Sequence, residues 1–249
     1  MMKLNRIIII YKIVVTLIFI SMFCSFLFSF NYNPRRFELI ETANNQVSYQ
    51  IELTNSSTIT ENVTINLNSW IVSDNKATFY PLTETWIVLD TSNIKLLPET
   101  STTVGFRLIV PDVLGEKRAE INFNTMMEGS NFTLSRSIPV FLIVGGTDLI
   151  DIEITKVYVA LTDDGHLQVS TVFQNNGNIH IRPRVEFRIT GEENWIRIAD
   201  DVPIYPESER IVSKELGADE LLDGREVEVR MMYYNSQGEI ITKHYFFSI

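Results

Sequence analysis

The sequence contains almost no cysteine. A single one, Cys24, is present among 249 residues, and it lies inside the apolar stretch that opens the chain. The rest of the chain therefore forms no disulfide bond, which excludes the small secreted folds that depend on disulfides. With 45% hydrophobic and 21% charged residues, the chain is expected to be stabilised by packed hydrophobic cores instead.

Signatures of catalysis are also missing from the sequence. It has no G-x-S-x-G, no Gly-rich phosphate loop and no H-E-x-x-H. Its three histidines, His166, His180 and His244, are far apart, whereas zinc ligands usually come at close spacing. We therefore predict that they are surface residues. Asp163–Asp164 and Asp200–Asp201 lack the alternating oxygen ligands of a calcium loop and predict turns. We expect a protein that is not an enzyme and binds no cofactor or metal.

Basic residues are too few for a nucleic-acid-binding protein. The net charge of the chain is −10; residues 31–146 contribute −4 and residues 147–249 contribute −9. Nucleic-acid phosphates require a basic face. The composition therefore argues against nucleic acid, and also against anionic lipid, as a partner of the folded part.

The one long hydrophobic run lies at the N-terminus. Lys3 and Arg6 precede residues 7–30, where Lys12 is the only charge. This pattern predicts a leader helix over residues 1–30, either a cleaved signal peptide or a membrane anchor through residues 7–30. Lipidation of Cys24 is a third alternative, although no small residue precedes it. All three place the protein outside the cytoplasm, in the periplasm or at the cell envelope.

After the leader the apolar residues recur with a period of two. Alternation over residues 47–53, 63–67 and 104–110 predicts strands with one buried face. Turn residues lie between such runs at 128–131, 162–165 and 235–238. Short strands with frequent turns and little helix predict an all-β protein built of β-sandwiches.

The two halves of the sequence resemble each other. A strand ending at Asn55 is matched by one ending at Asn175, and Leu97–Ser101 is matched by Tyr205–Glu209. With Gly145–Asp148 as a boundary, we predict two tandem immunoglobulin-like β-sandwich domains, residues 31–146 and 147–249.

Tryptophan and other aromatic residues gather in the first half. Trp70, Phe79, Tyr80 and Trp86 lie within seventeen residues, which we interpret mainly as core packing, with a carbohydrate-binding platform as the alternative. Trp195 is expected to have the corresponding core position in the second half.

Residues 34–144 resemble the first domain of the periplasmic pilus-assembly chaperones, two-domain immunoglobulin-like proteins that bind pilus subunits. The resemblance implies a chaperone that lends a strand to an incomplete subunit sandwich. The motifs that carry it are Pro34-x-Arg36-Phe37-x-Leu39, the strand that ends at Asn55, Ser69-Trp70, Leu97-Pro98-Glu99 and Pro111.

The resemblance also implies the partner-binding residues. Arg36 or Arg35 matches the arginine that anchors a subunit's C-terminal carboxylate. The sequence departs from the family at its second basic anchor, because Pro139 and its apolar neighbours replace the lysine and Pro139 removes a backbone donor. Arg136 is the nearest substitute. The alternating apolar face of the donor strand matches Phe132, Leu134, Ile138, Val140 and Leu142.

Two hypotheses about function follow. In the first, the protein is a chaperone-like binding protein that holds an exported protein subunit by β-strand addition. In the second, it is a structural or adhesive module of the cell envelope without a client. The first rests on the resemblance, and the second rests on the missing lysine and the acidic second half.

Overall fold

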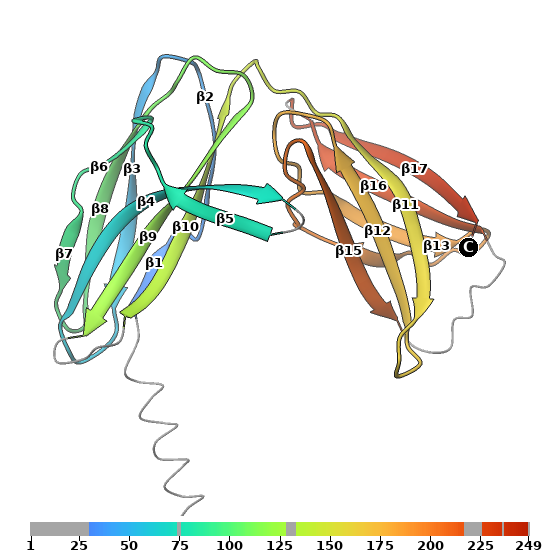
Figure 1. Cartoon of the computed structure of the whole chain (residues 1–249), viewed down its shortest axis with the longest axis horizontal. Helices are drawn as coiled ribbons and strands as arrows, with labels where there is room; N and C mark the ends of the chain where they lie inside the picture. The colour runs from blue at the N-terminus through green and yellow to red at the C-terminus, as the bar shows by residue number, and fades with distance from the viewer. Residues whose placement is uncertain (1–29, 74–75, 128–132, 217–225, 236, 249) are drawn as a thin grey trace, which may run out of the picture.

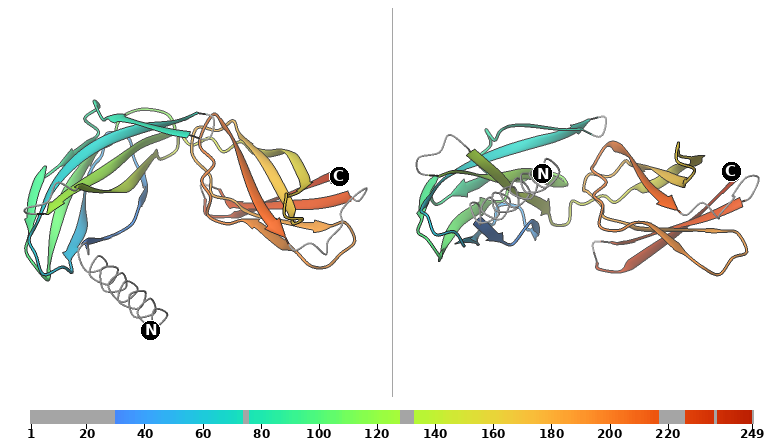
Figure 2. Two further views of the ribbon diagram at one scale, coloured as in Figure 1. Left: turned by 60° about the horizontal axis from the view of Figure 1, so that its bottom comes forward. Right: turned by 90° about the horizontal axis from the view of Figure 1, so that it is seen from below.

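A computed structural model of the chain describes residues 30–73, 76–127, 133–216, 226–235 and 237–248. All regular elements in these residues are β-strands, and they form two β-sandwiches that follow one another along the chain and meet at an angle (Figures 1 and 2). The predicted all-β class with tandem immunoglobulin-like sandwiches is confirmed. Apart from Phe30, the predicted leader lies outside the described residues. Within the described ranges no helix is long and apolar enough to cross a membrane.

The first sandwich consists of two sheets. One has the strand order β1-β3-β8-β6 and the other β2-β10-β9-β4-β5, with β7 paired to β4. All these pairs are antiparallel except β2 with β10, which is parallel. The strands are β1 (Phe30–Asn33), β2 (Phe37–Glu41), β3 (Gln46–Asn55), β4 (Glu61–Ser73), β5 (Lys76–Pro81), β6 (Ile87–Leu89), β7 (Asn93–Leu96), β8 (Thr100–Ile109), β9 (Glu116–Met127) and β10 (Thr133–Val144).

The second sandwich is built in the same way from a sheet β11-β12-β15 and a sheet β14-β13-β16-β17. The turn over Thr162–Gly165 joins β11 and β12 as predicted, with Gly165 at φ 82°, while the turn predicted at 128–131 lies outside the described residues. The strands are β11 (Ile152–Leu161), β12 (Leu167–Asn175), β13 (Arg184–Ile189), β14 (Ile196–Ala199), β15 (Ser208–Leu216), β16 (Glu226–Tyr234) and β17 (Ile240–Ser248).

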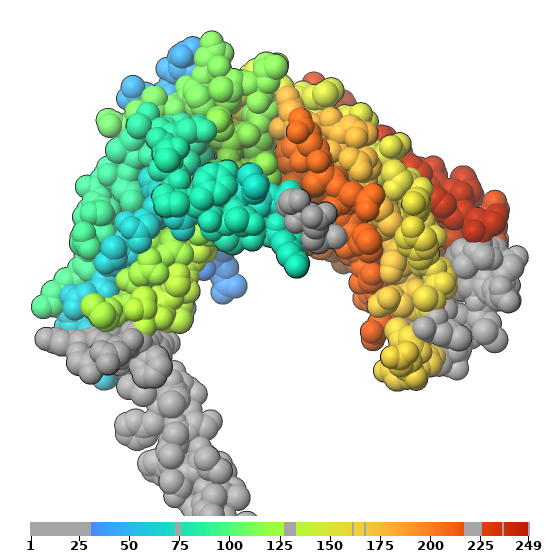
Figure 3. All heavy atoms as spheres, in the orientation of Figure 1, coloured from blue at the N-terminus to red at the C-terminus, as the bar shows by residue number. Residues whose placement is uncertain are grey.

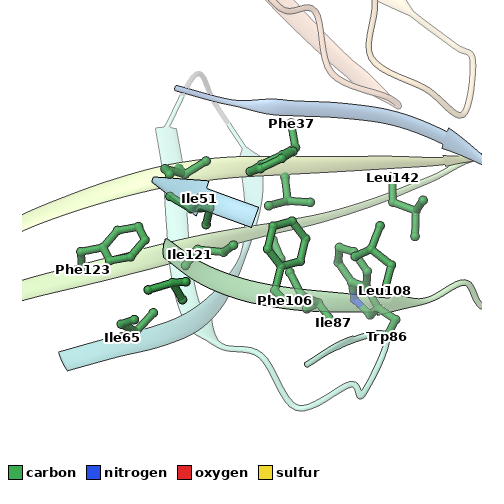
Figure 4. Close-up of a cluster of buried hydrophobic side chains, with 14 of the residues drawn as sticks. Phe37, Ile51, Ile65, Trp86, Ile87, Phe106, Leu108, Ile121, Phe123 and Leu142 are labelled. Carbon is green, nitrogen blue, oxygen red and sulfur yellow. The ribbon is translucent and has the colours of Figure 1, made fainter. Parts of the chain in front are cut away.

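Each sandwich has its own hydrophobic core. Figure 4 shows the first, in which side chains from both sheets, among them Phe106, Ile121 and Phe123, interdigitate. The alternating residues of each strand supply these side chains, so the period of two in the sequence reports which face is buried. A separate cluster around Phe173 and Phe187 fills the second sandwich. The chain passes between the sandwiches after Val144. Division into two domains at 145–148 stays a prediction.

The similarity between the two halves extends to individual hydrogen bonds. Asn55, at the end of β3, is fully buried, and its amide donates to the carbonyl oxygens of Ile59, Leu96 and Leu97. Asn175, at the end of β12, is also fully buried and donates to Ile179 and Ile204. Each asparagine therefore connects the end of its strand with the segment that enters the matching turn.

The matching turns also have the same backbone conformation. Glu99 and Glu207 both adopt φ 54°. In each turn the next residue hydrogen-bonds back to the residue before the proline, Thr100 to the Leu97 carbonyl oxygen and Ser208 to that of Tyr205. The repeated pattern in the sequence thus corresponds to the same hydrogen-bonded turn in both halves.

The aromatic cluster of the first half is only partly in the core. Trp86 belongs to the first core and Trp70 is buried against Phe141, but Phe79 and Tyr80 are 52% and 43% exposed. They lie on β5, in the β4–β5 hairpin that reaches past the first sandwich towards β15 (Figure 1). The core interpretation was therefore wrong for these two residues, because β5 is the outermost strand of its sheet and pairs only with β4 among the described strands.

Trp195 is not a core residue either. It is half-buried outside the second core, and its ring packs against the guanidinium groups of Arg188 and Arg230, with 4.4 and 4.0 Å from the ring centroid to the two Cζ atoms. These arginines hydrogen-bond Glu228 and Glu186 on the same sheet. Trp195 therefore covers a charged ladder, where its ring gains cation–π contacts.

Candidate partner-binding edge and the contact between the sandwiches

Strand β10 is paired on one side along nearly its whole length and on the other side along only part of it. It pairs with β9 from Thr133 to Ile143. On the opposite side β2 pairs only with residues Val140 to Val144. Among the described strands none pairs with residues 133–139 on that side. This stretch, which we call the β10 edge, leaves backbone groups available for another strand.

Two hydrogen bonds identify which backbone groups point out of the β10 edge. The N–H of Gly145 donates to Glu41, on the β2 side, and the carbonyl oxygen of Ser137 accepts from the Tyr32 hydroxyl. Because backbone groups alternate in direction along a strand, odd-numbered residues face outwards here. Thr133 and Ser135 therefore present their N–H and C=O groups at the edge, together with the N–H of Ser137.

Pro139 belongs to the same odd-numbered set. Its nitrogen, which carries no hydrogen, faces the β10 edge rather than β9, so the proline costs no hydrogen bond of the β9–β10 ladder. The edge can therefore extend a ladder along residues 133–137, and Pro139 ends it.

The predicted apolar face of the donor strand points inwards. Ile138, Val140 and Leu142 are fully buried in the first core, whereas Leu134 is half-buried. Phe132 lies outside the described residues. The even-numbered side chains of β10 are thus buried in the core at one end of the strand and partly exposed at the other. Among the described residues of this face, Leu134 is the apolar side chain that solvent reaches.

Arg136 is half-buried on the same inward face. Its charge acts on Glu61, a buried carboxylate that accepts a hydrogen bond from Ser57. Burial raises the pKa of Glu61, while the hydrogen bond and the Arg136 charge act against this. Arg136 therefore acts on a buried acid of β4, which β9 separates from β10.

The two predicted anchors differ in their surroundings. Arg35 is exposed. Arg36 donates two hydrogen bonds to Asp201 of the second sandwich, at 2.7 and 3.1 Å, and forms an ion pair with Glu38 at 3.2 Å. The hydrogen bond to Arg36 lowers the pKa of Asp201. Arg36 thus links the two sandwiches.

His180 is another residue for which the prediction from the sequence was wrong. It is 7% exposed rather than a surface residue. Its Nδ1 hydrogen-bonds Glu116 at the start of β9, and its backbone N–H donates to the same carboxylate at 3.0 Å. Its Nε2 lies 3.6 Å from Glu38 on β2. One imidazole of the second sandwich therefore contacts two carboxylates of the first.

These contacts set the charges around His180. Burial lowers the pKa of the imidazole, but the hydrogen bond to Glu116 and the ionic contact with Glu38 outweigh it and raise the pKa above the ordinary value. The contact with His180 lowers the pKa of Glu38 to about 2 against the effect of burial, helped by the charges of Arg182 and Arg36. The cluster therefore favours an imidazolium beside an ionised Glu38.

Aromatic packing completes the contact between the sandwiches. The Phe141 ring lies against His180 with 4.2 Å between centroids, and against Tyr205 with 6.4 Å. Val72 and Ala77 of the β4–β5 hairpin line a hollow of about 430 Å³ together with residues from Pro203 to Ile211. The two sandwiches together leave one side of the molecule concave (Figure 3). The sandwiches therefore meet through a small ionic and aromatic contact beside an open concave surface.

Comparison with solved structures identifies proteins with a similar fold. The crystal structure of the class 5 fimbriae chaperone CfaA matches with a TM-score of 0.50 and 12% identity, over 87% of this chain and 98% of that one. The YadV chaperone matches with a TM-score of 0.51 and 13% identity, over 88% of this chain and all of that one. The fold is that of the fimbrial chaperones. No family model matches the sequence, and no curated protein matches it significantly.

Proposed function

We propose that this protein is an exported, non-enzymatic chaperone-like protein that holds an exported protein subunit by β-strand addition to the β10 edge. The observation that carries the proposal is the unpaired stretch of β10 at residues 133–139, beside the point where β2 begins. The fimbrial-chaperone fold supports it. The apolar leader of the sequence supports a location outside the cytoplasm.

The geometry of the edge defines how the partner binds. A strand laid against residues 133–137 would pair with the outward backbone groups of Thr133, Ser135 and Ser137. Each such hydrogen bond contributes about 0.5–1.5 kcal/mol net, so the short ladder needs side-chain contacts as well. Leu134 offers an apolar contact, and Arg35 and Arg36 stay the predicted anchors for a partner's carboxylate.

The proposal predicts that Ser135→Pro abolishes partner capture. The substitution removes an outward N–H and puts a pyrrolidine ring in the path of the added strand, but it takes no hydrogen bond from the β9–β10 ladder. We expect the affinity for the subunit to fall by at least about tenfold, the equivalent of about 1.4 kcal/mol. The measurement is co-purification of the tagged full chain with exported proteins from envelope fractions, followed by titration of the captured subunit.

Ser135→Ala is the matched control for this experiment. Both variants lose the hydrogen bonds between Ser135 and Asn122, but alanine keeps the backbone N–H. Retention of a stoichiometric subunit by the wild type and Ser135→Ala, with loss by Ser135→Pro, supports strand addition. Equal capture by all three chains would exclude this edge as the binding site. Envelope association without a subunit would favour the structural module instead.

A further inference from the structure

We propose that His180 is a proton-operated latch between the two sandwiches: its imidazolium holds the first sandwich through Glu116 and Glu38 together, and loss of the proton releases the Glu38 contact. This inference concerns the coupling of the sandwiches and does not depend on the proposed function.

The latch needs both ring nitrogens to carry hydrogen. Nδ1 hydrogen-bonds Glu116, and Nε2 lies 3.6 Å from Glu38. A neutral imidazole has only one N–H. Glu116 has a fully buried side chain and also receives the His180 backbone N–H, so the remaining proton stays on Nδ1. The Nε2 lone pair then faces the Glu38 carboxylate, and an attractive contact becomes a repulsive one.

The other charged groups around His180 are arginines and carboxylates. Arg182 forms an ion pair with Glu38 at 2.6 Å and donates to the Asp201 carbonyl oxygen. Arg118, on β9, lies 3.6 Å from Glu116, and its guanidinium also packs over the Tyr205 ring. Arginine and ordinary carboxylate side chains keep their charges between about pH 6 and pH 9, whereas histidine titrates in that range. His180 is therefore the group of this contact that a change near neutral pH would alter.

The direction of the pH effect follows from the contacts. The pKa of His180 is raised in the folded chain, so its contribution is fully present below the unfolded-state pKa and is lost as pH rises through the folded-state pKa. Glu38, with a pKa of about 2, stays ionised throughout this range. The His180–Glu38 contact is thus attractive in mildly acidic solution and repulsive in alkaline solution. There the ion pairs of Arg182 with Glu38 and of Arg36 with Asp201 still connect the sandwiches, so the contact between them loosens without coming apart.

The test measures the distance between the sandwiches directly. Spin labels are attached at Gln50→Cys on β3 and Lys214→Cys on β15, both exposed positions, in a full chain carrying Cys24→Ser. The distance distribution is expected to be narrow at about pH 6 and broader at about pH 9. His180→Gln, which does not titrate, should give the broad distribution at both values. His166→Gln, on the exposed β11–β12 turn, should behave like the wild type.

A second variant covers the case in which His180→Gln does not fold. Glu38→Gln keeps the His180–Glu116 hydrogen bond but removes the charge on which the latch depends, and should also abolish the pH dependence. A distance distribution that still broadens with rising pH in Glu38→Gln or His180→Gln would overturn the proposal. A wild-type distribution that is the same at both pH values would overturn it as well.

Discussion

Replacing Gly115 with alanine is expected to lower the free energy of unfolding by about 3–5 kcal/mol. Gly115 has φ +77°, and an added Cβ would lie 2.5 Å from the carbonyl oxygen of Asn178 and 2.8 Å from its Cβ. The backbone N–H of Glu116 donates to that same oxygen. The substitution therefore strains the backbone and forces apart the two sandwiches where β9 begins, next to the carboxylate that holds His180.

Gly146→Ala is the matched control for Gly115→Ala. Gly146 has a similar φ of +81°, but an added Cβ meets no atom within 4 Å. Its cost is backbone strain alone, about 1 kcal/mol. Urea denaturation of the two variants measures the difference. Equal losses in both would show that the Asn178 contact yields easily, and that the sandwiches are not held closely at this point.

Replacing Asn175 with alanine is the second change expected to have a large effect. Its buried amide donates to Ile179 and Ile204, and its Oδ1 accepts the N–H of Gly177. Alanine leaves the carbonyl oxygen of Ile179 and the N–H of Gly177 without these partners inside the second sandwich, while the carbonyl oxygen of Ile204 keeps the N–H of Ile181. We therefore expect a loss of about 3 kcal/mol of unfolding free energy.

The neighbouring Asn176→Ala provides the comparison for Asn175. The Asn176 side chain is exposed, so its removal is expected to change the stability by less than about 0.5 kcal/mol. Thermal and urea unfolding of both variants decide the matter. A decrease in unfolding free energy for Asn175→Ala as small as that for Asn176→Ala would mean that the hydrogen bonds of Asn175 do not hold β12 to the following turn.

The sequence predicted the parts of the fold that depend on local pattern. Alternation over residues 47–53 and 104–110 marked β3 and β8, because one face of each strand is buried in the first core. The similar segments around Asn55 and Asn175 predicted two similar sandwiches, because each buried asparagine hydrogen-bonds the segment that leads into the following turn.

What the sequence could not show depends on contacts between elements far apart in the chain. His180 reads as a surface residue because no set of closely spaced ligands surrounds it in the sequence, and only the packing of the sandwiches brings Glu116 and Glu38 to its ring. Trp195 directly follows a turn, where the apolar residues show no period of two that would indicate which face of a strand its side chain is on. Pro139 reads as a break in β10 until the direction of its nitrogen is known.

The β10 edge was partly visible in the sequence. The resemblance to pilus-assembly chaperones indicated this strand, but it named an apolar face whose residues Ile138, Val140 and Leu142 lie in the core. Which stretch of backbone stays unpaired depends on where β2 starts to pair with β10, and that register is a property of the folded sheet.

The most direct test of strand addition is hydrogen exchange at the β10 edge in the complex isolated from the envelope. The backbone amides of Ser135 and Ser137 should exchange rapidly in the free protein and become protected when the subunit is bound. Amides of β10 that already face β9, such as Ile138, serve as the internal reference and should be protected in both states. Unchanged exchange at Ser135 and Ser137 in a stoichiometric complex would contradict the account, because the partner would then bind elsewhere.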